Sequence, residues 1–174
     1  DSLFVDLFYE DESAKKNLLS LYNALGGTAY TDTEELEVTT LEDAVYMNYK
    51  NDISFVLDWE LMLYEHQSTA NPNMPLRDLF YVAKVLQGLT KDANIYGSEL
   101  VIIPAPKFAV FYNGTDLRPE RETLRLSSAY GKKMPMEEGQ PDLELRVMVY
   151  NINLGHNPEL LGLCPKLGEY AQYV

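Results

Sequence analysis

Several polar side chains follow the apolar run LML, at a point where the chain would be expected to leave its core. The stretch that begins there reads YEHQSTANPNMPLR, and it supplies a carboxylate, an imidazole, an amide and a guanidinium, namely Glu65, His66, Gln67 and Arg77. A further carboxylate, Asp52, stands just before the preceding apolar run. Paired carboxylate oxygens suit hard cations such as Mg²⁺ or Mn²⁺, and such ions activate water and polarise phosphoryl oxygens.

Two short runs rich in β-branched and aromatic residues must position these groups. Residues 53–58 (ISFVLD) and 61–67 (LMLYEHQ) are expected to form an antiparallel hairpin with its turn near Trp59. A turn at that position places Asp52 roughly opposite His66. Asp52 would then stand near the polar end of the second strand.

Alternation along a strand sorts the polar residues onto two faces. Glu65 and Gln67 share one face, and His66 points to the other, where it is expected to serve as a core or supporting histidine. Two carboxylates that converge, here Asp52 and Glu65, repel each other unless a cation or a proton lies between them. The alternative is that both acids are simply solvated at a strand end, and the spacing alone does not separate the two interpretations.

The helix expected after NPNMP presents two faces. Its apolar stripe is predicted to face the core and consists of Leu76, Leu79, Phe80, Ala83, Leu86 and Leu89. Arg77, Tyr81 and Lys84, spaced four and three residues apart, lie on another face. Pro75 suits the first turn of this helix, and Asn73 suits the capping position before it.

The remaining periodicity predicts an α/β domain with a central mixed sheet covered by helices. The expected helices span residues 1–9, 12–25, 76–90 and 158–174. The expected strands span residues 44–49, 53–58, 61–67, 107–113 and 143–153, with 122–130 as a further strand or edge segment. With 174 residues the chain suits one domain.

Composition restricts the functional classes. The formal net charge is −13, which argues against strong nonspecific binding of nucleic acid, although residues 77–133 hold 9 bases and 6 acids and leave room for a local basic face. No apolar run is long enough to cross a bilayer. A single cysteine, Cys164, favours a reducing cytoplasm. No signal-peptide pattern opens the sequence.

Five segments together resemble a known family. The segments NDISF, YEHQST with NPNMPLR, VFYNGT, NINLGHN and the opening DSLFVDLF are similar to the PD-(D/E)XK nuclease family transposases, the Rpn-type recombination-promoting nucleases. The resemblance spans nearly the whole chain and implies a restriction-endonuclease-like core. It also implies a cytoplasmic, Mg²⁺- or Mn²⁺-dependent hydrolase that cleaves DNA in recombination. Family members continue with further helices, so residues 1–174 are expected to form a single nuclease-like domain without that C-terminal extension.

The resemblance assigns roles residue by residue. Asp52, Glu65 and the backbone carbonyl of His66 would be metal ligands. Gln67 stands where the superfamily more commonly has lysine, and its amide would orient water or donate to a phosphate oxygen. Arg77 would supply the missing cation, with Lys84 as the second choice.

Other positions extend or depart from the family pattern. Tyr81 would line the site and, with Arg77 and Lys84, contact nucleic acid. Asp1 matches the acid of the family's first-helix motif, but Val5 occupies its basic position. This departure favours an alternative, a catalytically inactive or regulatory relative that binds a protein partner or nucleic acid. A DNA-mimicking inhibitor is a third possibility, and a homodimer fits a nuclease that cuts two strands.

Overall fold

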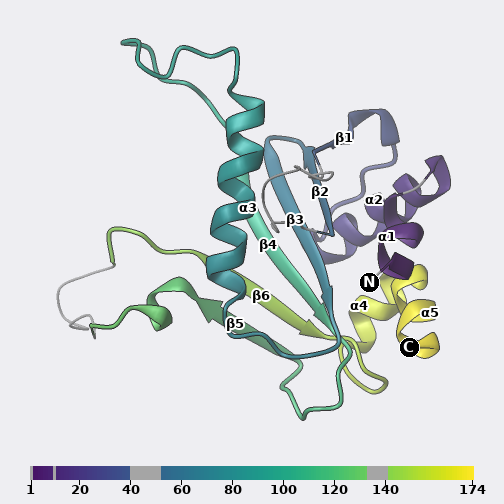
Figure 1. The fold of residues 1–174 in the computed structure, drawn as a ribbon. Coiled ribbons are helices and arrows are strands. Elements are labelled where there is room, and N and C mark those ends of the chain that lie inside the picture. The colour runs from purple at the N-terminus through teal and green to yellow at the C-terminus, as the bar shows by residue number, and fades with distance from the viewer. Residues whose placement is uncertain (1, 10, 40–51, 133–140) are drawn as a thin grey trace.

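The fold is that of a computed structural model, which describes residues 2–9, 11–39, 52–132 and 141–174. These residues form an α/β structure in which helices cover both faces of a six-stranded mixed sheet (Figure 1). The strands are β1 (Glu37–Val38), β2 (Ile53–Leu57), β3 (Glu60–Gln67), β4 (Ala105–Tyr112), β5 (Arg121–Arg125) and β6 (Arg146–Asn151). The helices are α1 (Ser2–Tyr9), α2 (Glu12–Gly26), α3 (Met74–Leu89), α4 (Pro158–Leu163) and α5 (Pro165–Tyr173), with short 3₁₀ turns at Thr33–Glu35 and Leu126–Ala129.

The strand order in the sheet is β1-β2-β3-β4-β6-β5. The β3–β4 and β4–β6 pairs are parallel, and the β1–β2, β2–β3 and β5–β6 pairs are antiparallel. Helix α3 provides the crossover between the parallel strands β3 and β4, which places it against one face of the sheet. The mixed sheet flanked by helices agrees with the predicted fold class.

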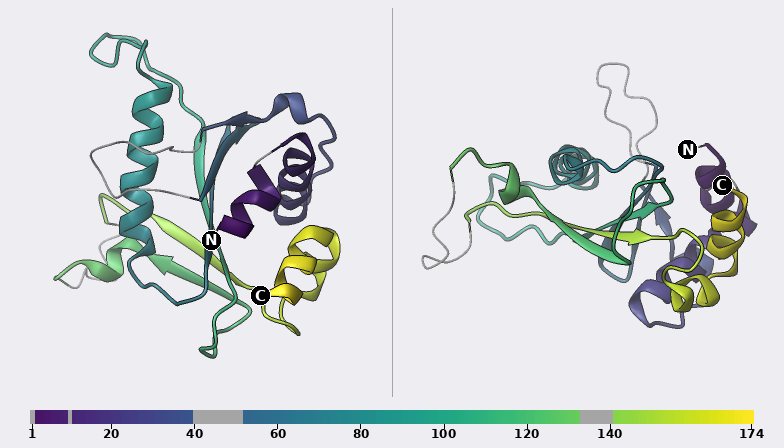
Figure 2. Two further views of the ribbon diagram at one scale, coloured as in Figure 1. Left: turned by 45° about the vertical axis from the view of Figure 1, so that its right-hand side comes forward. Right: turned by 90° about the horizontal axis from the view of Figure 1, so that it is seen from below.

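One core layer lies between the sheet and the two terminal pairs of helices, α1–α2 and α4–α5 (Figure 2). Its most buried side chains include Phe4, Phe8, Leu18, Leu21, Phe55, Tyr64, Phe111 and Tyr170. Asp11 caps α2 by accepting a hydrogen bond from the Ala14 N–H at 2.8 Å, and Gly27 ends it with φ at 65°. The predicted helix at 158–174 is two helices, because Pro165 starts a new one directly after Cys164.

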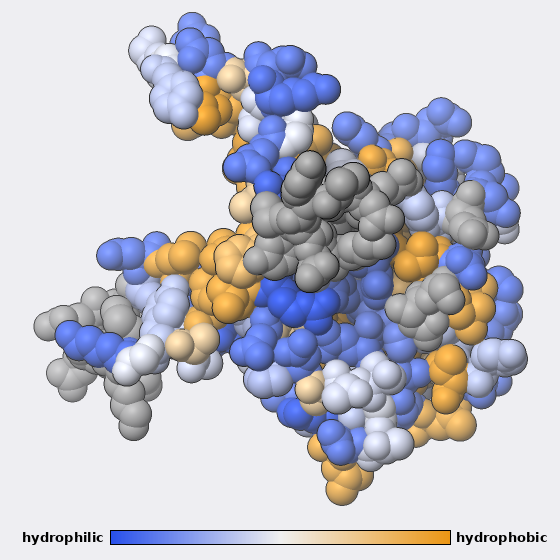
Figure 3. Space-filling model, in the orientation of Figure 1, coloured by the Kyte–Doolittle hydropathy of each residue, from blue (hydrophilic) through white to orange (hydrophobic). Residues whose placement is uncertain are grey.

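Helix α3 covers the opposite face with a different stripe from the predicted one. Its buried residues are Met74, Pro75, Asp78, Tyr81, Val82 and Val85. Leu76, Ala83 and Leu89 of the predicted core stripe are exposed, as is Phe80, while Leu79 and Leu86 are half-buried. The prediction was wrong because it excluded Asp78 and Tyr81 from the core face, and both side chains pack inward. Hydrophobic surface therefore appears over α3 and the segment that follows it (Figure 3).

The β2–β3 hairpin confirms the predicted turn and corrects its register by one residue. Asp58 and Trp59 occupy the turn with φ of 48° and 60°, the left-handed conformation that suits a two-residue hairpin loop. Ile53 pairs with Tyr64 and Leu57 with Glu60. Continuing that register by one residue places Asp52 opposite Glu65 rather than His66. A shift of one residue also exchanges the face of the sheet to which each side chain points. In the observed register, the alternation of side chains assigns Asp52 and Glu65 to one face.

Hydrogen bonds from asparagine side chains hold two loops at the carboxyl ends of β4 and β6. The Asn151 amide donates to the Arg118 carbonyl at 3.0 Å, and the buried Asn157 amide donates to the carbonyls of Glu120 and Asn151 at 2.6 and 2.8 Å. Gly114 passes so close to Ser68 that an added Cβ would stand 2.3 Å from the Ser68 carbonyl oxygen. The segments VFYNGT and NINLGHN thus have a structural role at this edge of the sheet.

Other predicted segments differ in extent. The strand predicted at 143–153 is shorter, and the segment 122–130 divides into β5 and a 3₁₀ turn. The strand predicted at 44–49 lies outside the described residues. Within the described part of the chain, no helix has the length and apolar character of a membrane span.

Candidate functional site

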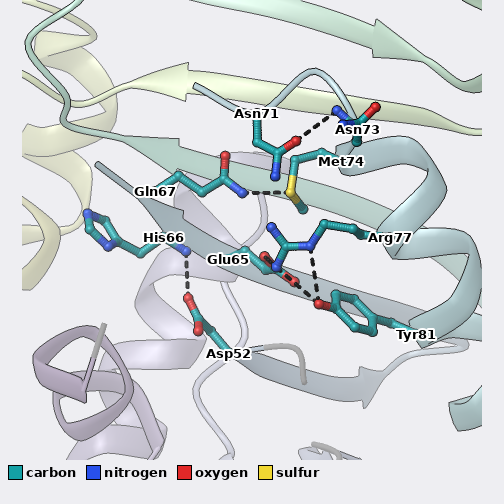
Figure 4. A network of polar contacts seen from close by, with 9 residues as sticks. All are labelled: Asp52, Glu65, His66, Gln67, Asn71, Asn73, Met74, Arg77 and Tyr81. Atoms are coloured by element: carbon teal, nitrogen blue, oxygen red, sulfur yellow. Dashed lines mark hydrogen bonds and ion pairs between the residues drawn. The ribbon is translucent and has the colours of Figure 1, made fainter. Parts of the chain in front are cut away.

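The carboxyl end of β3 and the first turns of α3 bring together six of the predicted site residues, namely Asp52, Glu65, His66, Gln67, Arg77 and Tyr81 (Figure 4). Strand β3 carries Glu65 and Gln67 on the face toward α3, together with Leu61 and Leu63 of the α3 core layer. His66 points to the other face. The predicted separation of these side chains onto two faces agrees with the structure.

Asp52 is bound to the backbone of β3. Its Oδ2 accepts a hydrogen bond from the His66 N–H at 2.8 Å. The Asn113 N–H donates to the Gln67 carbonyl at 3.1 Å, so Gln67 directs its peptide groups toward β4. Because neighbouring residues of a strand direct their peptide groups to opposite sides, the carbonyl of His66 points to the side where Asp52 lies. Asp52 and the predicted backbone ligand therefore share one side of β3.

Glu65 is a nearly completely buried acid, with 4% of its surface exposed. Its Oε2 accepts a hydrogen bond from Arg77 Nη2 at 3.2 Å, and its Oε1 is buried without a hydrogen-bond partner in the described structure. Burial raises the pKa of Glu65 to about 8, and the charges of Asp78 and Asp52 act in the same direction, while Arg77 lowers it. Figure 4 shows the Glu65 carboxylate directed at Arg77 and the Asp52 carboxylate at the His66 backbone.

Arg77 is held by two side chains. Besides Glu65, it binds the Tyr81 hydroxyl through Nε at 3.3 Å and Nη2 at 3.0 Å, and its guanidinium lies 5.7 Å from the centre of the Tyr81 ring. Tyr81 is buried, whereas the Arg77 side chain is 37% exposed. The predicted grouping of Arg77 and Tyr81 beside Glu65 is therefore present. Lys84 is exposed on α3 and forms no hydrogen bond or ion pair with another described residue.

Asp78 belongs to the same site and escaped the sequence analysis. It is 2% exposed, and its Oδ1 is buried without a hydrogen-bond partner among the described residues. Burial raises the pKa of Asp78 to about 7, and Arg77 opposes this change. The sequence signal that could have revealed Asp78 is its helical spacing from Met74, Tyr81 and Val82, which places all four residues on one face of the helix. It was missed because the apolar stripe had been assigned to another face of the helix.

Gln67 and His66 have partners of their own. The Gln67 amide donates to Met74 Sδ, which holds it at the start of α3. The His66 ring packs against Phe4 and Tyr170, at 5.8 and 5.1 Å between ring centres, and its Nε2 lies 2.7 Å from Asn113 Oδ1. Burial lowers the pKa of His66 despite the Asn113 contact. The His66 ring is thus packed in the core on the face that the sequence predicted for it.

The oxygens available for a metal come from few groups. Asp52, Glu65 and the His66 carbonyl could supply three oxygen ligands, the type that Mg²⁺ and Mn²⁺ prefer. The buried, unsatisfied Oε1 of Glu65 fits this hypothesis because it offers a lone pair that no described protein group uses. Within the described residues, no cluster of three or more Asp, Glu, His or Cys side chains could hold a metal. Asp1, the predicted first-helix acid, lies outside the described residues.

Comparison of the chain with protein-family models, with curated proteins and with solved structures finds no match in any of the three. The resemblance to recombination-promoting nucleases therefore stays a prediction that depends on the quoted sequence segments and on the site geometry.

Proposed function

We propose that this protein is a divalent-metal-dependent DNA endonuclease with a restriction-endonuclease-like core, of the recombination-promoting type. The observation that carries the proposal is the arrangement at the end of β3. A buried carboxylate, Glu65, lies beside a cation from the next helix, Arg77, and a second carboxylate, Asp52, is fixed to the adjoining backbone of His66. Each of these groups has a role in phosphodiester hydrolysis.

Asp52, Glu65 and the His66 carbonyl would hold Mg²⁺ or Mn²⁺. The metal, when bound, supplies Lewis acidity toward water and the scissile phosphate. Arg77 is the residue that would stabilise the negative charge of the phosphate, because its guanidinium is partly exposed and Tyr81 orients it. Gln67 is neutral at all relevant pH values, so it would orient water or donate to a phosphate oxygen rather than carry charge.

The test is nicking of a supercoiled plasmid with Mg²⁺ or with EDTA. The native chain is compared with Glu65→Gln and Asp52→Asn, which keep side-chain shape, and with Glu99→Gln, an exposed acid outside the site. We expect cleavage only with the metal, a loss of at least a hundredfold in both site variants, and full activity in the control. Equal cleavage by the native chain and Glu65→Gln would refute the assignment.

A second candidate is a catalytically inactive or regulatory nuclease-fold protein that binds a protein partner or nucleic acid. The ion pair between Glu65 and Arg77 favours it, because the guanidinium already occupies one oxygen of a carboxylate that is only 4% exposed. Calorimetry with Mn²⁺ on the native chain and on Asp52→Asn separates the two candidates. Heat of binding that disappears in the variant supports the nuclease, whereas no binding by the native chain supports the inactive relative.

A further inference from the structure

We propose that the sheet face opposite α3 carries a second anion site, in which Arg125, Arg146 and Lys107 hold the phosphate groups of a single-stranded nucleic acid. The site lies on β4, β6 and β5, beyond the helices that cover the rest of this face (Figure 2). It does not include Glu65 or Arg77. The proposal therefore holds whether or not the chain cleaves DNA.

The three cations stand in one row across neighbouring strands. Arg125 and Arg146 are directly opposite in the β5–β6 pair. Ala109 pairs with Met148 between β4 and β6, and two residues further back that register places Lys107 beside Arg146. All three side chains are exposed. The row faces away from α3, because Val147, Val149 and Leu124 occupy the α3 side of the same strands.

The two arginines face each other across the β5–β6 pair, and the Glu144 carboxylate interacts with the charge of Arg125 without forming an ion pair with it. Like charges directly opposite on antiparallel strands repel each other. Neither Arg125 nor Arg146 forms an ion pair or side-chain hydrogen bond with another described residue. Guanidinium groups on two directly opposite residues are suited to the oxygens of a phosphate, which accept forked hydrogen bonds from arginine. An anion between them would replace this repulsion with attraction.

The acids near the row are already engaged. Glu60 forms an ion pair with Lys107 at 2.5 Å. Glu144 accepts hydrogen bonds from the Ser127 N–H and hydroxyl at 3.0 and 2.6 Å. Burial raises the pKa of Glu144, but these bonds, one from Leu145 and the charge of Arg125 outweigh it and lower the pKa. The cations thus outnumber the acids three to two, and hydrogen bonds reduce the capacity of Glu144 to compete for a guanidinium.

A cavity adjoins the row and gives it the form of a groove. Its volume is about 710 Å³, and Lys107, Arg125 and Arg146 line it together with Tyr150 and, from the end of α2, Leu25. The Arg121 guanidinium lies 5.4 Å from the centre of the Tyr150 ring and extends the positive charge along the sheet. A cationic groove of this kind can follow a flexible phosphate backbone, and a single strand is flexible enough to enter one walled by a helix.

Binding of a fluorescent 15-nucleotide single strand, followed by anisotropy in EDTA at low salt, tests the proposal. The native chain is compared with Arg125→Gln/Arg146→Gln and with the control Lys91→Gln/Lys132→Gln, which removes two exposed charges elsewhere. We expect the arginine variant to bind about tenfold more weakly. Its slope of log affinity against log salt should be shallower by about 1.4, because two phosphate contacts are lost.

Native affinity and salt slope in the arginine variant would overturn the proposal, as would an equal loss in the lysine control, which would mean that only net charge matters. Thermal unfolding of both variants verifies the fold, and the arginine variant should unfold no earlier than the native chain. Competition with pyrophosphate identifies the source of the phosphate. Retention of the oligonucleotide at matched phosphate concentration supports the nucleic acid as the ligand, whereas displacement would overturn that assignment in favour of a free phosphate compound bound by the same arginines.

Discussion

Replacement of Glu65 by glutamine should stabilise the protein at neutral pH and above. The variant keeps the shape of the side chain and removes its charge. Burial, with Asp78 and Asp52, raises the pKa of Glu65 to about 8 from an ordinary value of 4.5, although Arg77 acts in the opposite direction. Between these two pH values the folded chain holds a proton on Glu65 that the unfolded chain has released.

The sign and size follow from proton linkage. Folding raises the pKa of this acid. The stability that its protonated form contributes is therefore fully present below about pH 4.5 and is lost as the pH rises through about 8. Each pH unit corresponds to about 1.4 kcal/mol, so the free energy of unfolding at pH 7 is lower by about 3 kcal/mol than it would be with an uncharged residue. The loss of the Arg77 contact reduces the gain, which leaves about 2 kcal/mol for Glu65→Gln at pH 7.

Urea unfolding at pH 5, 7 and 8.5 and constant ionic strength measures this difference. Glu65→Gln should lie near the native chain at pH 5 and exceed it increasingly at pH 7 and 8.5, with an unchanged denaturant slope. Glu99→Gln, at an exposed position, should track the native chain throughout. A difference between Glu65→Gln and the native chain that is constant across pH would refute the reasoning, because it would show that Glu65 has the same affinity for protons in both states.

Four further substitutions test the packing around the site. Gly114→Ala should lower the free energy of unfolding by about 1–3 kcal/mol, because its Cβ would stand 2.3 Å from the Ser68 carbonyl oxygen; urea unfolding measures it. Val85→Ala should lower it by about 2 kcal/mol and Leu76→Ala by about 0.5, and the reverse order would show that α3 presents the sequence-predicted stripe to the core. Tyr81→Phe should cost about 1 kcal/mol by removing the acceptor for Arg77 and should reduce plasmid nicking; native values for both would contradict a positioning role.

The hairpin could be read from the sequence because its signal is local. Asp58-Trp59 between two β-rich runs marks the turn, whereas the sequence predicted a mixed sheet without assigning the parallel pairing of β3 and β4 on either side of α3. The register was predicted one residue out, since turn position sets pairing and a turn near Trp59 admits two registers. The sequence placed Asp52 near His66, but the hydrogen bond from the His66 N–H to the Asp52 carboxylate could not be predicted, because it depends on that register.

The face of α3 that packs inward could not be read from hydrophobicity. The leucines and Phe80 give a regular stripe, yet the helix buries Asp78 and Tyr81 instead. Hydrophobic periodicity assumes that a core face holds no acid, and that assumption fails where a buried acid lies next to a cation such as Arg77. Asp78 was missed for this reason, although it raises the pKa of the predicted site residue Glu65.

Buried acids of this kind are uncommon in an ordinary hydrophobic core. Glu65 and Asp78 are both nearly completely buried, each has an oxygen without a partner in the described structure, and the charge of Asp78 raises the pKa of Glu65. A glutamine and an asparagine would fill the same space without the cost of a buried charge, so folding stability alone does not account for two acids there. Sites that bind cations or transfer protons need such acids, and their cost to stability is the usual consequence. If Glu65→Gln both stabilises the fold and abolishes metal binding, the same side chain will have been shown to lower stability and to serve the function.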